Sequence, residues 1–304
     1  MNKELFREVA KSVAILSTAW AGYSVVRLLT TGSVDVARAN AEMVDSLQGA
    51  LGIGIEASMQ EALLGEAVGT LANSYYLLHF PVTVILLIAM FVRHRATIFP
   101  VVRDGLVVMT FLGLVVHLVF PLAPPRMLDD IIDASTMYGP NPYAIPGSGA
   151  ANQFAAMPSM HVAWALVAGW ALWRSANTPV VRLVGIVHPA LTVVVVVITG
   201  HHFLLDAIVG SLFAVVALAG ASAYHQSRAK AGDNMALVHS SSTAQTSRNR
   251  AISPSYPLVP HNHSLAPLTV CQRLPKNRSP ASRSRPAVPL SHPIVTMRTC
   301  SSPH

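Results

Sequence analysis

The stretch ITGHHFLLDAIVG, residues 198–210, joins two apolar runs that are each long enough to cross a bilayer. The runs lie near 180–199 and 203–224, and the sequence Gly-His-His separates them. Ionisable side chains at membrane depth are costly to bury, so they are functional candidates by default. The stretch therefore predicts two consecutive membrane helices, with His202 and Asp206 where the second one begins.

Four more apolar runs of similar length precede these two. The chain of 304 residues is 52% hydrophobic and only 12% charged, which is too apolar for an ordinary soluble domain. We therefore predict an all-α fold: a polytopic membrane protein with a bundle of six transmembrane helices, an outward-facing loop and interfacial helices. The other four predicted spans lie near 10–29, 74–92, 104–122 and 158–174.

Two segments between the predicted spans are more than linkers. In the first, residues 35–72, apolar side chains recur at helical spacing at Met43, Leu47 and Leu51. This pattern predicts one or two amphipathic helices that lie on the membrane surface or form a helical hairpin capping the bundle. The second, residues 123–157, is rich in Pro, Gly and Asn, and a loop of this length is usually functional or disordered.

Charge divides the chain into a near-neutral part and a basic tail. Residues 1–226 hold 11 Lys/Arg and 13 Asp/Glu, whereas residues 227–304 hold 10 Lys/Arg and a single acid. The tail is rich in Ser, Pro and Arg, which is typical of disorder, and it is either an inert extension or a contact for anionic lipid. No nucleic-acid partner is predicted. We expect three parts: a first transmembrane helix with its flanks at 1–34, a membrane domain at 35–224 and a disordered tail at 225–304.

Positive charge gathers in alternate loops. Lys and Arg side chains precede the first predicted span, stand between spans two and three and between spans four and five, and follow span six. By the positive-inside rule these segments are cytoplasmic. We therefore expect an integral, multi-pass protein of the plasma membrane, with both termini in the cytoplasm and the loop at 123–157 outside.

His202 and Asp206 are four residues apart, which places both side chains on one face of a helix. A carboxylate in that position can accept a hydrogen bond from one imidazole nitrogen and make the other nitrogen the better nucleophile. Free backbone N–H groups in the first helical turn, together with the helix dipole, also favour an anion such as phosphate. Taken alone, the pair fits a structural contact or a metal site as well as it fits catalysis.

The stretch AAMPSMHVAWAL, residues 155–166, begins the fourth predicted span with Pro158, Ser159 and His161. Proline costs little at a helix start, and a serine there can cap the helix or donate to a phosphate oxygen. His161 can protonate a leaving alkoxide as a general acid, and Arg126 offers a fork of N–H donors to phosphate oxygens. Together these residues favour catalysis on a phosphate ester at the extracytoplasmic face.

The stretches PLAPPR (121–126), AAMPSMH (155–161) and GHHFLLD (200–206) resemble the membrane superfamily of type 2 phosphatidic acid phosphatases. The similarity is closest to the branch that includes inositol phosphorylceramide synthases, and it covers roughly residues 35–224. The resemblance implies a six-helix bundle and a phosphohistidine mechanism that needs no metal and no cofactor. It also implies that the substrate is a membrane lipid phosphate or phosphodiester.

The resemblance gives each candidate residue a role. It implies that His202 is the nucleophile, that Asp206 orients it, and that His161 is the general acid. The residues that would hold the substrate phosphate are Arg126, Ser159 and His201.

The sequence departs from the superfamily pattern at positions that usually bind phosphate. The first motif usually begins with Lys and ends in Arg-Pro, where this chain has Val119 and Met127. The third usually carries Ser-Arg shortly before the nucleophile, where this chain has Val195 and Val196, and Met160 replaces a glycine of the second. A site with fewer cations suits a phosphodiester better than a dianionic monoester. This favours transfer of a phospho-head group, with water or another alcohol as the acceptor.

Two other classes of protein remain open. A transporter or channel could use the His/Asp cluster as a proton relay, but its expected signs, mid-span charges and repeated broken helices, are absent from the sequence. A CDP-alcohol phosphotransferase would need an Asp-rich metal motif, and LDDIID (128–133) lacks its glycine and later aspartates. The remaining membrane histidines, His79, His117 and His188, are expected to be interhelical hydrogen bonders.

Overall fold

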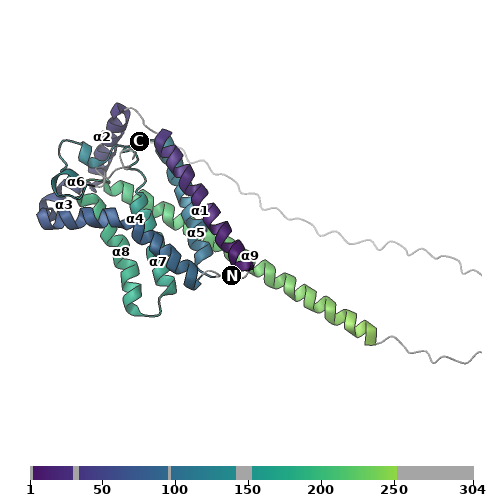
Figure 1. Cartoon of the computed structure of the whole chain (residues 1–304). Helices are drawn as coiled ribbons and strands as arrows, with labels where there is room; N and C mark the ends of the chain where they lie inside the picture. Colours follow the sequence, from purple (N-terminus) through teal and green to yellow (C-terminus); the bar gives the residue numbers. More distant parts are fainter. Residues whose placement is uncertain (1–2, 30–33, 95–96, 142–152, 252–304) are drawn as a thin grey trace, which may run out of the picture. The chain divides into compact units, whose positions relative to one another are not determined.

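In the computed structural model, the regular secondary structure of the described residues is helical. These are residues 3–29, 34–94, 97–141 and 153–251. They form nine α-helices and one short 3-10 helix, with no strand among them (Figure 1). In chain order the helices are α1 (Lys3–Leu29), α2 (Val34–Leu51), α3 (Glu56–Leu63), α4 (Glu66–His94), α5 (Phe99–Val119), η1 (Pro125–Met127), α6 (Ala134–Met137), α7 (Met160–Ser175), α8 (Pro179–Ile198) and α9 (Leu204–Ala251). The predicted all-α fold class is confirmed.

Four helices in the described part of the chain are long and apolar enough to cross a membrane. They are α4, α5, α8 and the portion Leu204–Leu237 of α9. This agrees with an integral membrane protein. Helices α1 and α7 occupy the first and fourth predicted spans but are not among the four. Helix α7 has only 16 residues. At 1.5 Å per residue it is about 24 Å long, shorter than the ~30 Å hydrocarbon core of a bilayer.

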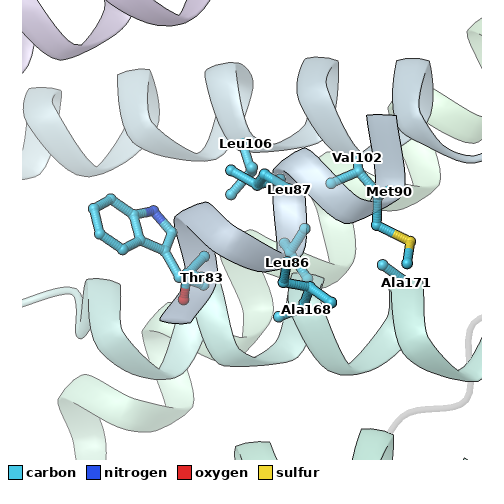
Figure 2. A pocket seen from close by; sticks show the side chains of 10 residues that line it. Thr83, Leu86, Leu87, Met90, Val102, Leu106, Ala168 and Ala171 are labelled. Atoms are coloured by element: carbon cyan, nitrogen blue, oxygen red, sulfur yellow. The ribbon is translucent and has the colours of Figure 1, made fainter. Parts of the chain in front are cut away.

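Helices α4, α5, α7 and α9 share an apolar core. Its buried side chains include Met90, Leu106, Met109, Val167 and Leu218. The core is closely packed, because the cavity that Figure 2 shows between α4, α5 and α7 has a volume of about 10 Å³. A cavity of that size barely holds one water molecule, so it is a packing gap and not a lipid site.

Helices α7 and α8 form an antiparallel pair joined by a short turn, and they contact each other extensively. Small residues allow this approach. A Cβ atom on Gly169 of α7 would lie 2.3 Å from the carbonyl oxygen of Gly185 in α8. Such small-residue crossings are typical of helices that pack within membranes.

Helix α2 covers the end of the bundle at which α9 begins, where α3 and α6 also lie (Figure 1). The buried face of α2 consists of Ala37, Ala41, Val44 and Gln48. The apolar residues that suggest an amphipathic helix are on another face: Met43, Leu47 and Leu51 are 54%, 47% and 59% exposed. Helix α2 therefore caps the bundle, one of the two predicted arrangements, while its larger apolar side chains face away from the protein.

Helix α9 continues beyond the predicted end of the last span. It runs to Ala251, whereas a disordered tail is expected from residue 225. The side chains from Gln226 to Leu237 are exposed, so local helix propensity and not packing accounts for this extension. The chain divides into the units 1–248 and 249–304, and the second lies almost wholly outside the described residues. The expected disorder of the remaining tail stays a prediction.

Candidate active site

The turn between α8 and α9 holds two histidines. The backbone N–H groups of His201 and His202 both donate to the carbonyl oxygen of Val196, at 3.1 Å. Gly200 has a φ of +71°, a backbone conformation that L side chains rarely adopt. A Cβ atom there would also lie 2.9 Å from the Cβ of Arg126. Glycine thus allows both the shape of the turn and the close approach of the loop that follows α5.

His202 is held at its Nδ1 atom. This atom lies 2.8 Å from the carbonyl oxygen of Ala156 and 3.5 Å from Oδ2 of Asp206. Burial lowers the pKa of His202 to about 4, an effect that the Ala156 hydrogen bond opposes and the charge of Arg126 strengthens. The ring is therefore neutral at pH 7, with its proton on Nδ1. No residue in the described ranges hydrogen-bonds to Nε2, which carries the lone pair.

Asp206 is fully buried in the first turn of α9. Its Oδ2 accepts the backbone N–H of Phe203 at 2.9 Å, the arrangement by which an acidic residue closes the start of a helix. The carbonyl oxygen of Asp206 accepts the N–H of Ser159 at 3.0 Å, which ties α9 to the start of α7. The closest acceptor for His202 is accordingly the Ala156 carbonyl, with the Asp206 carboxylate as a second and longer contact.

Two residues outside the sequence-based candidates close the N-terminus of α9. Glu56 of α3 accepts the backbone N–H of Leu204 at 2.7 Å, and Gln48 of α2 accepts that of Leu205 at 2.7 Å. Gln48 also donates to Glu56 at 3.0 Å, and both side chains are buried. For the N–H groups of Phe203, Leu204 and Leu205, the expectation that they are free to bind phosphate is therefore wrong, because Asp206, Glu56 and Gln48 accept them.

Ser159 caps α7. Its Oγ accepts the backbone N–H of Val162 at 3.4 Å, and the residue is completely buried. A hydroxyl group can donate while it accepts, so Ser159 can also act as a hydrogen-bond donor. Helix α9 passes so close that a Cβ atom on Gly210 would lie 2.4 Å from the carbonyl oxygen of Ser159.

His161 lies in the first turn of α7 and faces His202, with their ring centres 5.9 Å apart. It also stacks on Tyr76 at 4.1 Å and forms a T-shaped ring pair with His79 at 5.3 Å. His201 is also buried, and its ring stacks on Tyr76 at 4.0 Å. Two of the three histidines named by the sequence thus stack on one tyrosine of α4, and the third, His202, lies beside His161.

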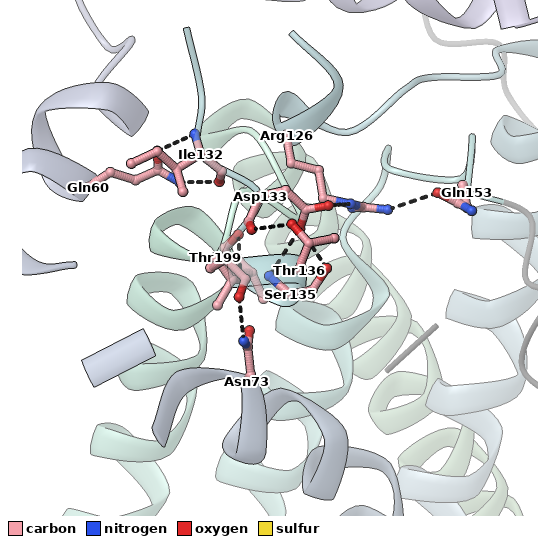
Figure 3. A network of polar contacts seen from close by, with 11 residues as sticks. Gln60, Asn73, Arg126, Ile132, Asp133, Ser135, Thr136, Gln153 and Thr199 are labelled. Carbon is pink, nitrogen blue, oxygen red and sulfur yellow. Dashed lines mark hydrogen bonds and ion pairs between the residues drawn. The ribbon is translucent and has the colours of Figure 1, made fainter. Parts of the chain in front are cut away.

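Arg126 is a buried cation, 8% exposed, in the loop after α5 (Figure 3). Its backbone N–H donates to the carbonyl oxygen of Gly200 at 2.9 Å, which fixes it beside the histidine turn. Its Nε lies 3.7 Å from Oδ2 of Asp133, and a terminal nitrogen donates to Gln153 at 3.4 Å. These two contacts are long, so an incoming phosphate can compete with them.

The loop between η1 and α6 is anchored to α3 and α4 (Figure 3). Gln60 bonds both the N–H and the carbonyl oxygen of Ile132, at 2.8 Å each. Asn73 donates to the carbonyl oxygen of Ala134 at 2.7 Å. The segment that is expected to be functional or disordered is therefore tied down at this end, while its part at 142–152 lies outside the described residues.

A surface groove of about 410 Å³ runs along residues 129–137, next to the contacts of Arg126. It is lined by Asp129, Asp130 and Asp133 together with apolar residues of the same loop. In the described parts of the chain, no group of three or more His, Cys, Asp or Glu residues is arranged to hold a metal ion.

A family model of the PAP2 superfamily matches residues 43–220, which is more than half of the chain. The chain belongs to the PAP2 superfamily. Membership points to phosphatase or phosphotransferase activity on lipid phosphate substrates. The matched range contains all six predicted site residues, whereas the likeness to the inositol phosphorylceramide synthase branch is not confirmed. No curated protein and no solved structure matches the chain.

In this PAP2 protein the six predicted site residues lie together at one end of the helices. They are Arg126, Ser159, His161, His201, His202 and Asp206. Four supporting residues were not predicted from the sequence: Gln48, Glu56, Tyr76 and Ala156. Of these, only the burial of Gln48 could have been predicted, because it continues the helical spacing of Ala37, Ala41 and Val44.

Proposed function

We propose that this PAP2 protein is an integral membrane lipid phosphatase or phospho-head-group transferase that works through a phosphohistidine on His202. The observation that carries the proposal is the state of the His202 ring. Its Nδ1 is held by Ala156 and Asp206, and its Nε2 has no partner within the described ranges. A neutral imidazole that is oriented at one nitrogen is a nucleophile at the other.

The reaction then has two halves. In the first, Nε2 of His202 attacks the phosphorus of a lipid phosphate ester, and the bond from phosphorus to the leaving oxygen breaks as His161 donates a proton to that oxygen. In the second, neutral His161 takes a proton from water or an alcohol, whose oxygen attacks phosphorus and breaks the P–N bond. His161 ends protonated, as it began, so the protons balance over the cycle.

Arg126, Ser159 and His201 are proposed to hold the phosphate. The planar guanidinium of Arg126 suits two phosphate oxygens, and its 3.7 Å contact with Asp133 is weak enough to be replaced. A fixed positive charge in a site that excludes water stabilises the charge that develops on the transferred phosphoryl group.

The reaction class within the superfamily is proposed to be head-group transfer. Valine stands at positions 119, 195 and 196 and methionine at 127, where the superfamily pattern has mostly polar or cationic residues. With Arg126 as the main cation, the site suits the single charge of a phosphodiester. The acceptor is water or another alcohol, and faster turnover of a nitrophenyl phosphate monoester than of the matching diester would contradict this assignment.

For the membrane arrangement we propose six spans in the plasma membrane, α1 and α7 included, with cytoplasmic termini and an extracytoplasmic site. The support is the alternation of Lys/Arg-rich segments along the sequence. Met137 of α6 is 63% exposed, so a cysteine there can be labelled by an impermeant thiol reagent on intact cells, in a chain whose two native cysteines are serines. Labelling only after lysis would reverse this orientation.

A proton relay in a transporter or channel is the second candidate function. One observation favours it: His79 of α4 stacks on His188 of α8 at 5.4 Å, so the histidines extend along the helices away from His202. Membership of the PAP2 superfamily favours the enzyme. A covalent phosphoprotein is expected only for the enzyme.

The deciding experiment traps that phosphoprotein. The full-length protein is mixed with a nitrophenyl phosphodiester that carries radioactive phosphorus, in the presence of a metal chelator, and quenched. We expect label that is stable to base, labile to acid and located on His202, and we expect none in His202→Ala. Label on Ser159 or His201, or a need for added divalent metal, would overturn the proposal.

A further inference from the structure

His202 has an acceptor for its second ring nitrogen, whereas His161 has none among the residues that the structure describes. The Ala156 carbonyl, 2.8 Å from Nδ1 of His202, decides which nitrogen of that ring carries the proton. His161 needs the same control after it has given up one proton, because its remaining proton must lie on the nitrogen that faces away from the acceptor. Within the described residues nothing hydrogen-bonds to the ring of His161. Its neighbour on α4 is His79, in a T-shaped arrangement with ring centres 5.3 Å apart and planes at 60°.

His79 is itself short of partners. It is 3% exposed, and neither of its ring nitrogens has a hydrogen-bond partner in the described part of the structure. Buried polar groups are nearly always hydrogen-bonded, so an imidazole with two unsatisfied nitrogens needs an explanation. Two imidazoles joined by an ordinary N–H···N hydrogen bond have ring centres roughly 5 Å apart. A small rotation of either ring therefore joins His79 to His161.

On the side away from His161, His79 packs against a set of hydrogen-bonded side chains between α4 and α8. The ring of His79 stacks on that of His188, with centres 5.4 Å apart and planes 16° apart. Nδ1 of His188 lies 2.7 Å from the hydroxyl of Tyr75, which is also 2.7 Å from Oγ1 of Thr192. Of the histidines expected to bond between helices, His188 does so, but His79 is left to face His161.

We propose that His79 is the positioning residue of His161. His79 accepts a hydrogen bond from the nitrogen of His161 that faces away from the phosphate. When the other nitrogen gives its proton to the leaving oxygen, the remaining proton stays on the nitrogen bonded to His79. The freed nitrogen is then ready to take a proton from the acceptor in the second half of the reaction. This assignment rests on the proposed function, because only a histidine that acts first as an acid and then as a base needs its remaining proton placed in this way.

The test compares two phosphodiesters that share one phosphoryl group, a nitrophenyl ester and an alkyl ester. A nitrophenolate leaves without a proton, whereas an alkoxide needs one. For full-length His79→Phe we expect turnover of the alkyl ester to fall about tenfold or more, while phosphohistidine forms from the nitrophenyl ester within about twofold of the parent rate. Combined with His161→Ala, the His79 substitution should cause no further loss on the alkyl ester, because both act through one group.

Thr83→Val is the matched control. Thr83 is buried one helical turn from His79 on the same helix, and its hydroxyl donates to the carbonyl oxygen of His79 at 2.8 Å. The Thr83→Val substitution removes this hydrogen bond within α4 but keeps the imidazole of His79, so both esters should react at the parent rate.

Several results would overturn the assignment. If His79→Phe slows both esters equally, or neither, His79 does not act through His161. If the parent forms no phosphohistidine, the proposed function fails and this inference fails with it. Only the assignment of His79 fails if the parent forms the phosphohistidine and His161→Ala selectively slows the alkyl ester, while His79→Phe does not.

Two further variants keep the test decisive if His79→Phe does not fold. His79→Gln retains an amide that can accept the hydrogen bond, so it should keep more alkyl-ester turnover than an apolar replacement. His188→Phe removes the ring that supports His79 without touching His161 and should give the same selectivity between esters with a smaller loss. The proposal would be contradicted by two results together: His188→Phe discriminates between the two esters as the parent does, and His79→Gln turns over the alkyl ester no faster than an apolar replacement does.

Discussion

Around Met109, Leu106 and Val167, helices α4, α5, α7 and α9 meet through apolar side chains. Around His202 the elements are joined by hydrogen bonds instead. The first backbone N–H groups of α9 are bonded by Glu56 of α3 and Gln48 of α2, and α7 is tied to α9 through backbone groups. Both regions are buried, but the attraction in the first is spread over many carbon atoms and in the second is concentrated in single pairs of atoms.

This difference decides what each region tolerates. Apolar contact has no preferred direction, so a core side chain can be replaced by another of similar volume at small cost. A buried hydrogen bond has one donor and one acceptor, and removing either leaves the other unsatisfied. Substitutions of the same size should therefore be more damaging at the end that holds His202, and four comparisons can break or sharpen that statement.

The largest effect is expected for Gly210→Ala. The new Cβ would lie 2.4 Å from the carbonyl oxygen of Ser159, which is backbone and cannot move aside. We expect a loss of about 3 kcal/mol in stability, measured as a fall of the unfolding midpoint in detergent, and a loss of activity. Gly220→Ala on the same helix meets open space and should be neutral or stabilising by up to about 1 kcal/mol. Equal behaviour of the two variants would show that α7 and α9 are not in this contact.

Glu56→Ala comes next. It leaves the N–H of Leu204 and the amide of Gln48 without their acceptor, so we expect a loss of about 2 kcal/mol in stability and slower formation of the phosphohistidine. Glu56→Gln keeps an acceptor and should lose less. The control is Glu61→Ala, an exposed acid of the same helix, which should stay within about 0.5 kcal/mol of the parent. If both alanine variants behave alike, Glu56 does not hold α9.

Arg126→Lys tests the buried cation without changing the charge. Lysine loses the planar fork that matches two phosphate oxygens, so turnover of a nitrophenyl phosphodiester should fall about tenfold, equivalent to ~1.4 kcal/mol. Arg38→Lys is the control, because the pairs of Arg38 with Asp129 at 3.1 Å and Glu42 at 3.6 Å are exposed and contribute little. Parent turnover in Arg126→Lys would remove Arg126 from the phosphate site.

The smallest effect is expected in the apolar core. Met109→Leu changes a fully buried side chain to another of similar volume and should cost less than about 1.5 kcal/mol. Gln48→Leu, an equally buried position at the other end, should cost about 2 kcal/mol, because the N–H of Leu205 loses its acceptor. The unfolding midpoints of the two variants in detergent give the comparison, and the reverse order would contradict the distinction between the regions.

The features that could be predicted are those set by residues close together in the sequence. The long helices follow from apolar runs that are continuous in the sequence, and the approach of His202 to Asp206 follows from a spacing of four residues. The cap on Leu204 comes from Glu56, 148 residues away in the chain, and such a contact exists only once the helices have packed. The same holds for Tyr76, whose place between histidines of two other segments no spacing reveals. The extension of α9 to Ala251 was missed because polar composition was taken as disorder, although many of those residues favour a helix.

The stereochemistry at phosphorus tests the central claim, a covalent bond from His202 to the phosphoryl group, most directly. A nitrophenyl phosphorothioate diester of one configuration is turned over by the full-length protein with methanol as the acceptor, and the configuration of the product is determined. Two successive in-line displacements, first by His202 and then by the alcohol, predict retention of configuration. Inversion would mean that the acceptor attacks the substrate directly, and it would contradict the account of this site.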